Sequence, residues 1–214
     1  MKLNKRLVKQ VNPKLVHYVK TQLFPIYDTL DNAHNSEHIV DVIHRSFHIA
    51  KSVPTTLNYN IVFAVASFHD IGLVKGRQGH ADISSEMVKS DEFLFSQFTE
   101  KEVEEIAIAV QDHSLSKNRE PRSLYGKLVA DADKDHNPKR SLRRMWEFSL
   151  SHFKERTWEE HIQLCYEYFY AKYGKNGRVK YYIPCKKTSK YLVKMKKMAE
   201  SPKRFRRTFA KFIR

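Results

Sequence analysis

Polar and apolar residues alternate along most of this chain with the three-to-four-residue period of a helix that buries one face. Residues 36–52 show the pattern clearly, because Ile39, Val42, Ile43 and Ile49 fall on one arc. The same pattern predicts further helices at 15–30 (interrupted near Pro25), 61–70, 82–97, 99–113, 157–172 and from Ser201 onward. We therefore expect a mostly helical protein.

Sequence signals mark the ends of several of these helices. Thr99 with Glu102, and Thr157 with Glu160, have the spacing of a capping box, in which each side chain bonds the other residue's backbone N–H. Gly174 is a typical helix stop. The helix predicted from Ser201 onward carries its apolar residues on one side, namely Phe205, Phe209, Phe212 and Ile213. Residues 178–184 (RVKYYIP) are expected to form a short extended segment.

The helix predicted at 61–70 is unusual because an uncharged apolar run, IVFAVASF, ends in His69 and Asp70. A buried polar group without a partner costs roughly 2–7 kcal/mol. Adjacent helix residues point about 100° apart and cannot satisfy each other. The pair therefore requires a third partner.

Composition narrows the class of protein. The chain has 214 residues, only 6 glycines and 7 prolines, and no apolar stretch near the roughly 18 residues of a membrane span. The N-terminus is basic but lacks the apolar region of a secretory signal. The chain has only two cysteines, Cys165 and Cys185, which is too few for a zinc site made of thiolates. They lie outside any CxxC spacing, and a reducing, cytoplasmic setting is expected.

The net charge of +15 is concentrated at one end of the chain. Residues 172–214 hold 16 Lys and Arg against a single acid, Glu200, whereas the first 171 residues hold 23 basic and 23 acidic residues. We therefore expect a neutral domain at 1–171 and a basic C-terminal helical extension at 172–214, packed on the domain or appended to it.

Other ionisable residues also lie at core-facing positions. His38 is at the rim of an apolar arc, with Asp41 and Arg45 on the same side, and His113 prolongs the apolar stripe of helix 99–113. Asp131 and Asp133 follow the apolar run LVA and need a cation or hydrogen-bond donors, for which capping of a following helix is the alternative. We expect the remaining histidines singled out in the sequence to be surface or core-edge residues: His17, His44, His152 and His161.

The order of these residues resembles the H…HD…D signature of the HD superfamily of metal-dependent phosphohydrolases, over roughly residues 12–135. The segments that carry the resemblance are AHNSEHIVDV, FHDIGLVKGRQGH, IAIAVQDHS and VADADKD. The resemblance implies an all-α HD-domain helical bundle, here as a small stand-alone HD protein. It also implies a metal site formed by His38, His69, Asp70 and one further aspartate, for which Asp133 is favoured over Asp131 because it follows an Ala as in the family.

Two imidazoles and two carboxylates suit Mn²⁺, Fe²⁺, Ni²⁺, Co²⁺ or Zn²⁺, with Mg²⁺ as an alternative. Such an ion would be the partner that the buried His69–Asp70 pair requires, and Asp70 would also orient the attacking water. The resemblance places His80 and His113 in the pocket, either as proton donors or as ligands of a second metal. Lys75 and Arg77 would bind substrate phosphate, for which a solvated loop is the alternative.

The predicted function is metal-dependent hydrolysis of a phosphoester or phosphoanhydride in a nucleotide or related small phosphorylated metabolite. A di-iron oxygenase is the alternative enzyme, because such members of the superfamily keep extra histidines at the positions of His80 and His113. A nucleic-acid-binding protein is the alternative from another class, because residues 172–214 interleave basic residues with aromatics. The aromatic residues of the last helix recur at helical spacing, which favours their packing onto a core over stacking on bases.

Overall fold

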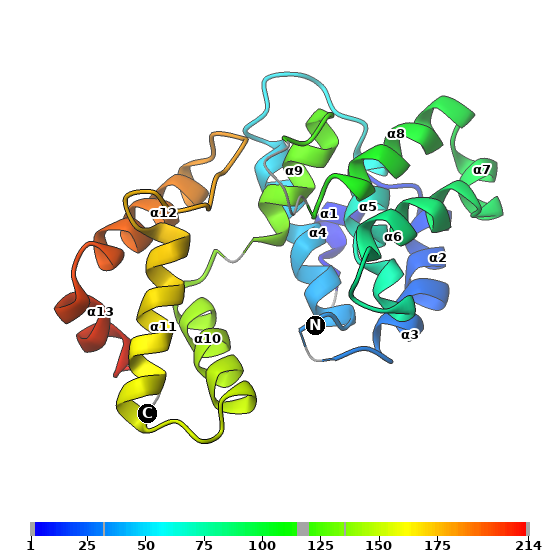
Figure 1. Cartoon of the computed structure of the whole chain (residues 1–214). Helices are drawn as coiled ribbons and strands as arrows, with labels where there is room; N and C mark the ends of the chain where they lie inside the picture. The colour runs from blue at the N-terminus through cyan, green and yellow to red at the C-terminus, as the bar shows by residue number, and fades with distance from the viewer. Residues whose placement is uncertain (1–2, 32, 115–119, 135, 213–214) are drawn as a thin grey trace. The chain divides into compact units, whose positions relative to one another are not determined.

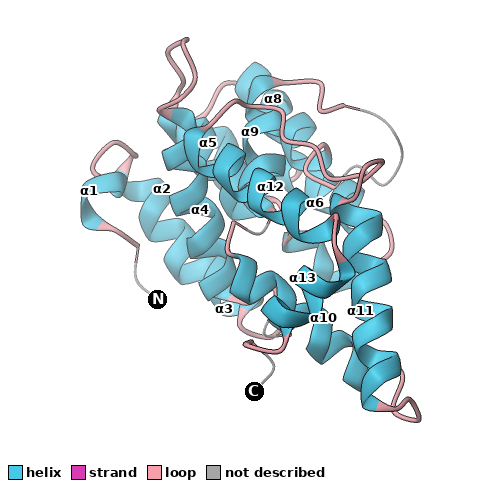
Figure 2. Ribbon diagram, turned by 90° about the vertical axis from the view of Figure 1, so that its left-hand side faces the viewer, coloured by secondary structure: helices cyan, strands magenta, loops and turns pink. Residues whose placement is uncertain are grey.

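The structure is a computed structural model that describes residues 3–31, 33–114, 120–134 and 136–212 (Figure 1). Within these residues it contains helices joined by loops and turns, and no strand (Figure 2). The chain divides into two compact units, Met1–Lys134 and Asp135–Arg214. The expected boundary at 171–172 instead lies inside a helix, Trp158–Tyr173, of the second unit.

Unit 1 begins with short helical segments and continues with longer helices that surround an apolar one. Its elements are α1 (Lys5–Val8), α2 (Pro13–Tyr18), a π-helical turn (Val19–Leu23), α3 (Phe24–Tyr27), α4 (Ser36–Ala50), α5 (Tyr59–Phe68), a 3-10 turn (Ile71–Lys75), α6 (His80–Lys89), α7 (Glu92–Gln97), α8 (Glu100–Gln111) and α9 (Leu124–Asp133). Pro25 does not end the helical path, because the π-helical turn directly precedes it.

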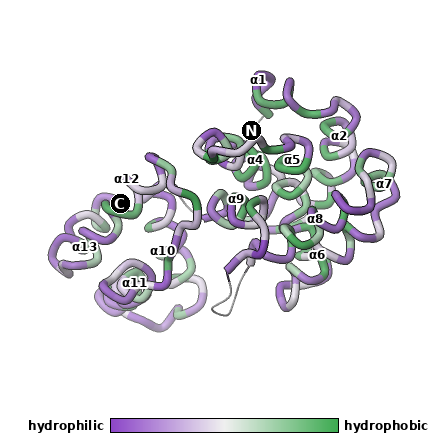
Figure 3. Tube along the Cα trace, turned by 90° about the horizontal axis from the view of Figure 1, so that it is seen from above, coloured by the Kyte–Doolittle hydropathy of each residue, from purple (hydrophilic) through white to green (hydrophobic). Residues whose placement is uncertain are grey.

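The core of unit 1 is built around α5. Every residue from Ile61 to Phe68 is buried, and the helix packs against α4, α8 and α9. Figure 3 shows α5 among the apolar segments of this unit. Since α5 has no exposed face, the residues that directly follow it, His69 and Asp70, are also buried.

A glycine fixes the chain just after these two residues. The 3-10 turn Ile71–Lys75 packs against α6, and a Cβ on Gly72 would lie 2.7 Å from the Ser84 backbone nitrogen and would also clash with the His80 carbonyl. The Gly72 N–H donates a 2.8 Å hydrogen bond to Ser84 Oγ. Only glycine permits this approach, which brings the N-terminus of α6 close to the end of α5.

Unit 2 has its own core. It consists of α10 (Pro138–His152), α11 (Trp158–Tyr173), α12 (Lys186–Ala199) and α13 (Pro202–Phe209). Aromatic contacts join these helices: Phe169 of α11 and Phe205 of α13 have ring centroids 5.1 Å apart, and Trp146 of α10 contacts Phe209. The prediction that the aromatic residues of the last helix pack onto a core is therefore confirmed for Phe205 and Phe209, whose side chains are fully buried.

Several predicted elements differ from the structure. The helix predicted at 82–97 is two helices, because Asp91 caps a new one by accepting the Leu94 N–H. Residues 178–184, predicted as a short extended segment, lie in a loop with a bend at 182–183 and belong to no strand. Ile213 lies outside the described residues. Both capping boxes are present, at Thr99 and at Thr157.

Candidate metal centre

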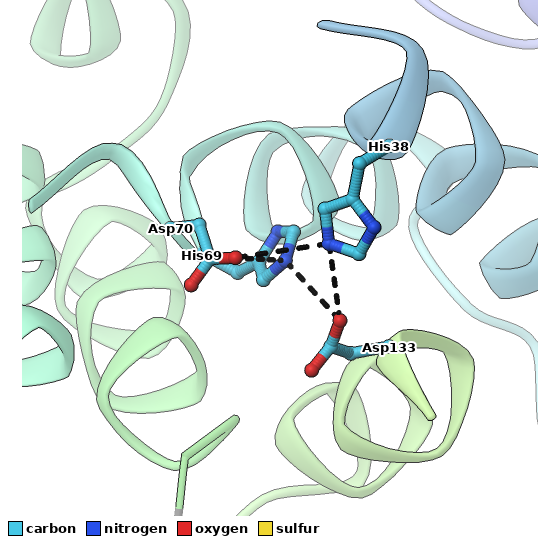
Figure 4. A group of neighbouring side chains, drawn as sticks. All are labelled: His38, His69, Asp70 and Asp133. Atoms are coloured by element: carbon cyan, nitrogen blue, oxygen red, sulfur yellow. Dashed lines mark ion pairs between the residues drawn. The ribbon is translucent and has the colours of Figure 1, made fainter. Parts of the chain in front are cut away.

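Four ionisable side chains from three helices of unit 1 converge on one point (Figure 4). His38 comes from the first turn of α4, His69 and Asp70 directly follow α5, and Asp133 is the last residue of α9. Each residue offers one potential ligand atom, and these four atoms all lie within 4.8 Å of one another. The structure thus brings together all four residues predicted as ligands.

The contacts inside this group join imidazole nitrogens to carboxylate oxygens. His38 Nε2 lies 3.2 Å from Asp133 Oδ1, and His69 Nε2 lies 3.3 Å from Asp70 Oδ2. The two cross contacts, His38 to Asp70 and His69 to Asp133, are both 3.7 Å. Each imidazole therefore faces both carboxylates.

Local structure fixes the direction of the two rings. Asn35 caps α4 by accepting the backbone N–H groups of Glu37 and His38, which holds His38 in the first helical turn. His69 Nδ1 lies 2.9 Å from the Ala66 carbonyl, to which it donates a hydrogen bond. This bond leaves the lone pair of a neutral His69 on Nε2, the nitrogen that points into the group.

In the part of the chain that the structure describes, two buried imidazole nitrogens of this group lack hydrogen-bond partners, as expected if the group binds a cation. His38 Nε2 and His69 Nε2 are buried, and within the described residues neither makes a hydrogen bond of acceptable geometry. Both nitrogens face carboxylate oxygens, and two acceptors can meet favourably only if a proton or a metal ion lies between them. Two imidazoles and two carboxylates form a donor set for a divalent transition metal.

The electrostatics of the group agree with this interpretation. Burial raises the pKa of Asp70 and of Asp133, but the neighbouring imidazoles outweigh it and hold both pKa values well below the usual range. Burial lowers the pKa of His38, and Asp133 offsets this only in part. Burial also lowers the pKa of His69, but Asp70 and Asp133 outweigh it and raise this pKa to about 10. Without a metal, a proton on His69 therefore provides the positive charge that the carboxylates require.

Asp70 also belongs to a second group, with His80 and His113. Its Oδ1 lies 3.2 Å from His113 Nε2 and 3.5 Å from His80 Nε2, whereas its Oδ2 faces the first group. The Nδ1 atoms of both histidines lie close to backbone carbonyls, of Arg77 for His80 and of Val110 for His113. Neutral forms that donate from Nδ1 would turn their Nε2 lone pairs toward Asp70, as in the first group.

The comparisons with known proteins agree with this geometry. Residues 35–137 match a family model described as HD domain. This segment of the chain belongs to the HD-domain superfamily. The matched segment runs from the cap of α4 past the end of α9 and includes every histidine and aspartate of both groups. No curated protein and no solved structure gives a significant match.

Membership indicates the general chemistry of the HD domain. HD-domain proteins are typically metal-dependent hydrolases that bind divalent metals, and the histidine–aspartate group of this chain fits such an ion. His38, His69, Asp70 and Asp133 would hold it. None of the helices that the structure describes has the length and hydropathy needed to cross a membrane.

The surroundings of α9 distinguish its two candidate aspartates. Asp133 points into the metal group with its side chain 35 % exposed. Asp131 is fully buried and forms an ion pair with Lys134 Nζ at 2.9 Å. Arg45 of α4 donates to the Lys134 carbonyl, which holds the end of α9 beside α4. The position of Asp133 thus agrees with the prediction that Asp133, and not Asp131, is the fourth ligand.

The two predicted phosphate-binding residues lie in different surroundings. Arg77 Nη2 is 3.4 Å from His34 Nε2, and the His34 ring lies beside that of His38, with centroids 6.0 Å apart. Arg77 is therefore at the rim of the metal group. Lys75 is exposed at the end of the 3-10 turn, and the described contacts do not bring it into either group.

Sequence reasoning missed two residues beside the site. His34 lies between Arg77 and Asp31, and its Nδ1 is 2.6 Å from Asp31 Oδ1. The sequence feature that could have identified His34 is its spacing of four residues from His38. Tyr27 is fully buried and donates its hydroxyl to the Ser67 carbonyl, which holds α3 against the end of α5. No pattern in the sequence around Tyr27 indicates this contact.

The four histidines expected at the surface or the core edge lie outside both groups, but one of them, His161, is buried. His17 and His152 are exposed. His44 accepts the Asn4 backbone N–H, and the buried His161 contacts Ser149 Oγ at 2.7 Å in unit 2.

Proposed function

We propose that this HD domain hydrolyses a phosphoester or phosphoanhydride bond in a nucleotide or a related small phosphorylated metabolite. One observation carries the proposal: the Nε2 atoms of His38 and His69 are buried, lack a hydrogen bond within the described residues and face two ionised carboxylates. That arrangement suits a divalent ion, for which we propose Mn²⁺ as the first to test. When bound, such an ion polarises a phosphoryl oxygen and lowers the pKa of water.

In this proposal Asp70 has a second task besides holding the metal. Its side chain is 7 % exposed, and its two oxygens face different histidine groups. An ionised carboxylate in that position orients the attacking water by accepting a hydrogen bond from it. Substitution of Asp70 therefore removes both a ligand and the group that directs the nucleophile.

In this proposal His80 and His113, which face Oδ1 of Asp70, act on the leaving group. Their Nε2 atoms lie 3.5 and 3.2 Å from Asp70 Oδ1. In the protonated form, either Nε2 donates a proton to the departing oxygen. The His113 side chain is 2 % exposed and that of His80 is 18 % exposed, so His80 is the more accessible to substrate.

Arg77 binds the phosphate in this proposal. Its guanidinium fork is suited to gripping two phosphate oxygens, and its contact with His34 places it at the rim of the metal group. Lys75, in the same segment, adds positive charge without a defined contact.

The test is a phosphate-release screen over nucleotides and dinucleotides, with Mn²⁺ and with a chelator. We expect turnover that stops on chelation and that is absent in Asp70→Ala. The matched control is Asp82→Asn, because Asp82 is an exposed residue of α6 that contacts Gln111. Turnover that survives in a folded Asp70→Ala variant would place the chemistry elsewhere.

A di-iron oxygenase is the second candidate, and the second histidine group supports it. Asp70 is shared between two groups that could each hold a metal. Two irons in the purified protein and oxygen consumption without phosphate release would favour this candidate. Phosphate release with Mn²⁺ would favour the hydrolase.

A further inference from the structure

The net charge of the chain resides entirely in unit 2. Residues 135–214 contain 22 Lys and Arg against 7 Asp and Glu, whereas residues 1–134 contain 17 of each kind. Unit 1 is thus electrically balanced, and the proposed hydrolysis uses none of the excess charge. Within unit 2, the excess begins at the end of α11 and continues through α12 and α13.

Helix α12 carries its lysines as a continuous exposed stripe. The helix has six lysines and no acid. At 100° per residue, five of them fall within an arc of about 100°. These five exposed lysines are Lys186, Lys187, Lys190, Lys194 and Lys197. At a rise of 1.5 Å per residue, the stripe is about 16 Å long.

Helix α13 continues this surface. Lys203, Arg204 and Arg207 are exposed and fall within an arc of about 100°, whereas Arg206 points elsewhere and pairs with Glu159. Arg204 Nη1 donates a 3.0 Å hydrogen bond to the Lys197 carbonyl, which places the Arg204 guanidinium beside the C-terminal end of the α12 stripe. We call these eight residues the α12–α13 basic surface: Lys186, Lys187, Lys190, Lys194, Lys197, Lys203, Arg204 and Arg207.

The apolar faces of both helices are used inside unit 2. Tyr191, Met195, Phe205 and Phe209 are each at most 4 % exposed and belong to one core cluster. Figure 3 shows polar and apolar positions alternating along α13. The buried aromatics cannot stack on bases, and a buried apolar face cannot insert into a membrane. The α12–α13 basic surface therefore offers positive charge with few accessible apolar groups.

We propose that the α12–α13 basic surface binds the phosphate backbone of a nucleic-acid duplex without reading its sequence. A duplex carries one negative charge per about 1.7 Å of its axis, twice the linear density of one strand, and flexible lysines act as point charges toward phosphates. A stripe of several lysines without an acid matches such a charge array. Burial of the aromatics of α12 and α13 favours a duplex over a single strand.

The test is fluorescence anisotropy of a labelled duplex titrated with the full chain across a salt series. Each phosphate contact contributes about 0.9 to the slope of log affinity against log salt. We expect the double variant Lys190→Gln/Lys194→Gln to bind more weakly, with a slope shallower by about 2.

Helix α12 provides its own control. Lys196 is also exposed, but it lies about 200° around the helix from Lys194. Lys194→Gln should make the slope shallower by about 1 and Lys196→Gln should leave it unchanged. Asp70→Ala should bind the duplex as the native chain does, so this result does not depend on the proposed hydrolysis.

Four results would overturn the proposal. They are no duplex binding even at low salt; equal effects of Lys194→Gln and Lys196→Gln; tighter binding to single strands than to duplexes; and binding to phosphatidylserine vesicles in the absence of duplex binding. The third would indicate base stacking and the fourth a membrane surface. Duplex binding that is lost with Lys190 and Lys194 and kept in Lys196→Gln would support the interface.

Discussion

At the scale of single residues, Asp70 connects the two halves of the site. Its Oδ2 faces His69 and His38, and its Oδ1 faces His113 and His80. The backbone carbonyls near the Nδ1 atoms of His69, His80 and His113 come from the residues three positions earlier. This repeated local contact directs three Nε2 atoms toward one carboxylate.

The roles of His80 and His113 can be separated by measuring metal content and turnover on the same variants. If His113 is the proton donor, His113→Ala should lower turnover by about 10²–10⁴ and leave the metal content unchanged. Loss of one metal ion in His80→Ala or His113→Ala would instead make these histidines ligands of a second metal. His17→Ala is the control, because His17 is exposed on α2.

Unchanged metal content and turnover in both His80→Ala and His113→Ala would contradict any function for the second group. The measurement should include a folded-state check, because the His113 side chain is almost fully buried.

The sequence could identify the ligand types but could not place both aspartates of α9. Asp131 and Asp133 are two positions apart, so they point about 200° apart around the helix and only one of them can join the group. Both follow an alanine in the same apolar segment, so the segment itself does not distinguish them, and only the family resemblance favoured Asp133. The ion pair of Asp131 with Lys134 makes the distinction, and this contact depends on where α9 ends.

At the scale of elements, the end of α5 and the start of α6 position the site. The apolar helix buries His69 and Asp70, and the close contact at Gly72 brings His80 toward them. The apolar run predicted the first feature. The second was not predictable, because it requires knowing that the 3-10 turn packs against α6.

Replacing Gly72 tests this close contact. Gly72→Ala should destabilise the chain by roughly 1–3 kcal/mol, because the added methyl group overlaps the Ser84 backbone nitrogen and the His80 carbonyl. Because α6 must move to relieve the overlap, turnover should fall as well. Chemical denaturation and a turnover assay measure the two effects.

Gly79→Asn is the matched control on the same segment. Gly79 has φ 69°, no atom of the described residues lies within 4 Å of the place where a Cβ would stand, and Asn is among the side chains that tolerate this backbone region. The Gly79→Asn variant should therefore lose little free energy of unfolding. Equal losses in the two variants would show that the Gly72 contact has no special importance.

Two helices rich in basic residues, α10 and α12, are among the elements that the sequence pattern failed to predict. Helix α12 has buried Tyr191, Met195 and Met198 at spacings of four and three, but six lysines surround them. Helix α10 likewise buries Leu142, Met145 and Trp146 within a basic segment. Their helical pattern becomes clear only when the rest of unit 2 shows what those apolar residues contact.

At the scale of the whole molecule, the chain combines a neutral unit 1, which contains the metal group, with a strongly basic helical unit 2. The expected division at 171–172 followed the change in charge, whereas the compact units divide at 134–135. The difference arises because residues 135–171, which include α10 and most of α11, carry balanced charge as a whole but pack with the basic helices α12 and α13. Charge patterns therefore located the basic surface, and packing located the boundary.

The central claim is that His38, His69, Asp70 and Asp133 together hold one divalent metal ion. Metal analysis of the chain and of Asp133→Ala, after equilibration with Mn²⁺, tests it most directly. The Asp133 side chain is partly exposed, so its removal should leave the fold intact. We predict a bound metal ion in the native chain that is lost in Asp133→Ala. A native chain without metal, or a folded variant that retains it, would contradict the account.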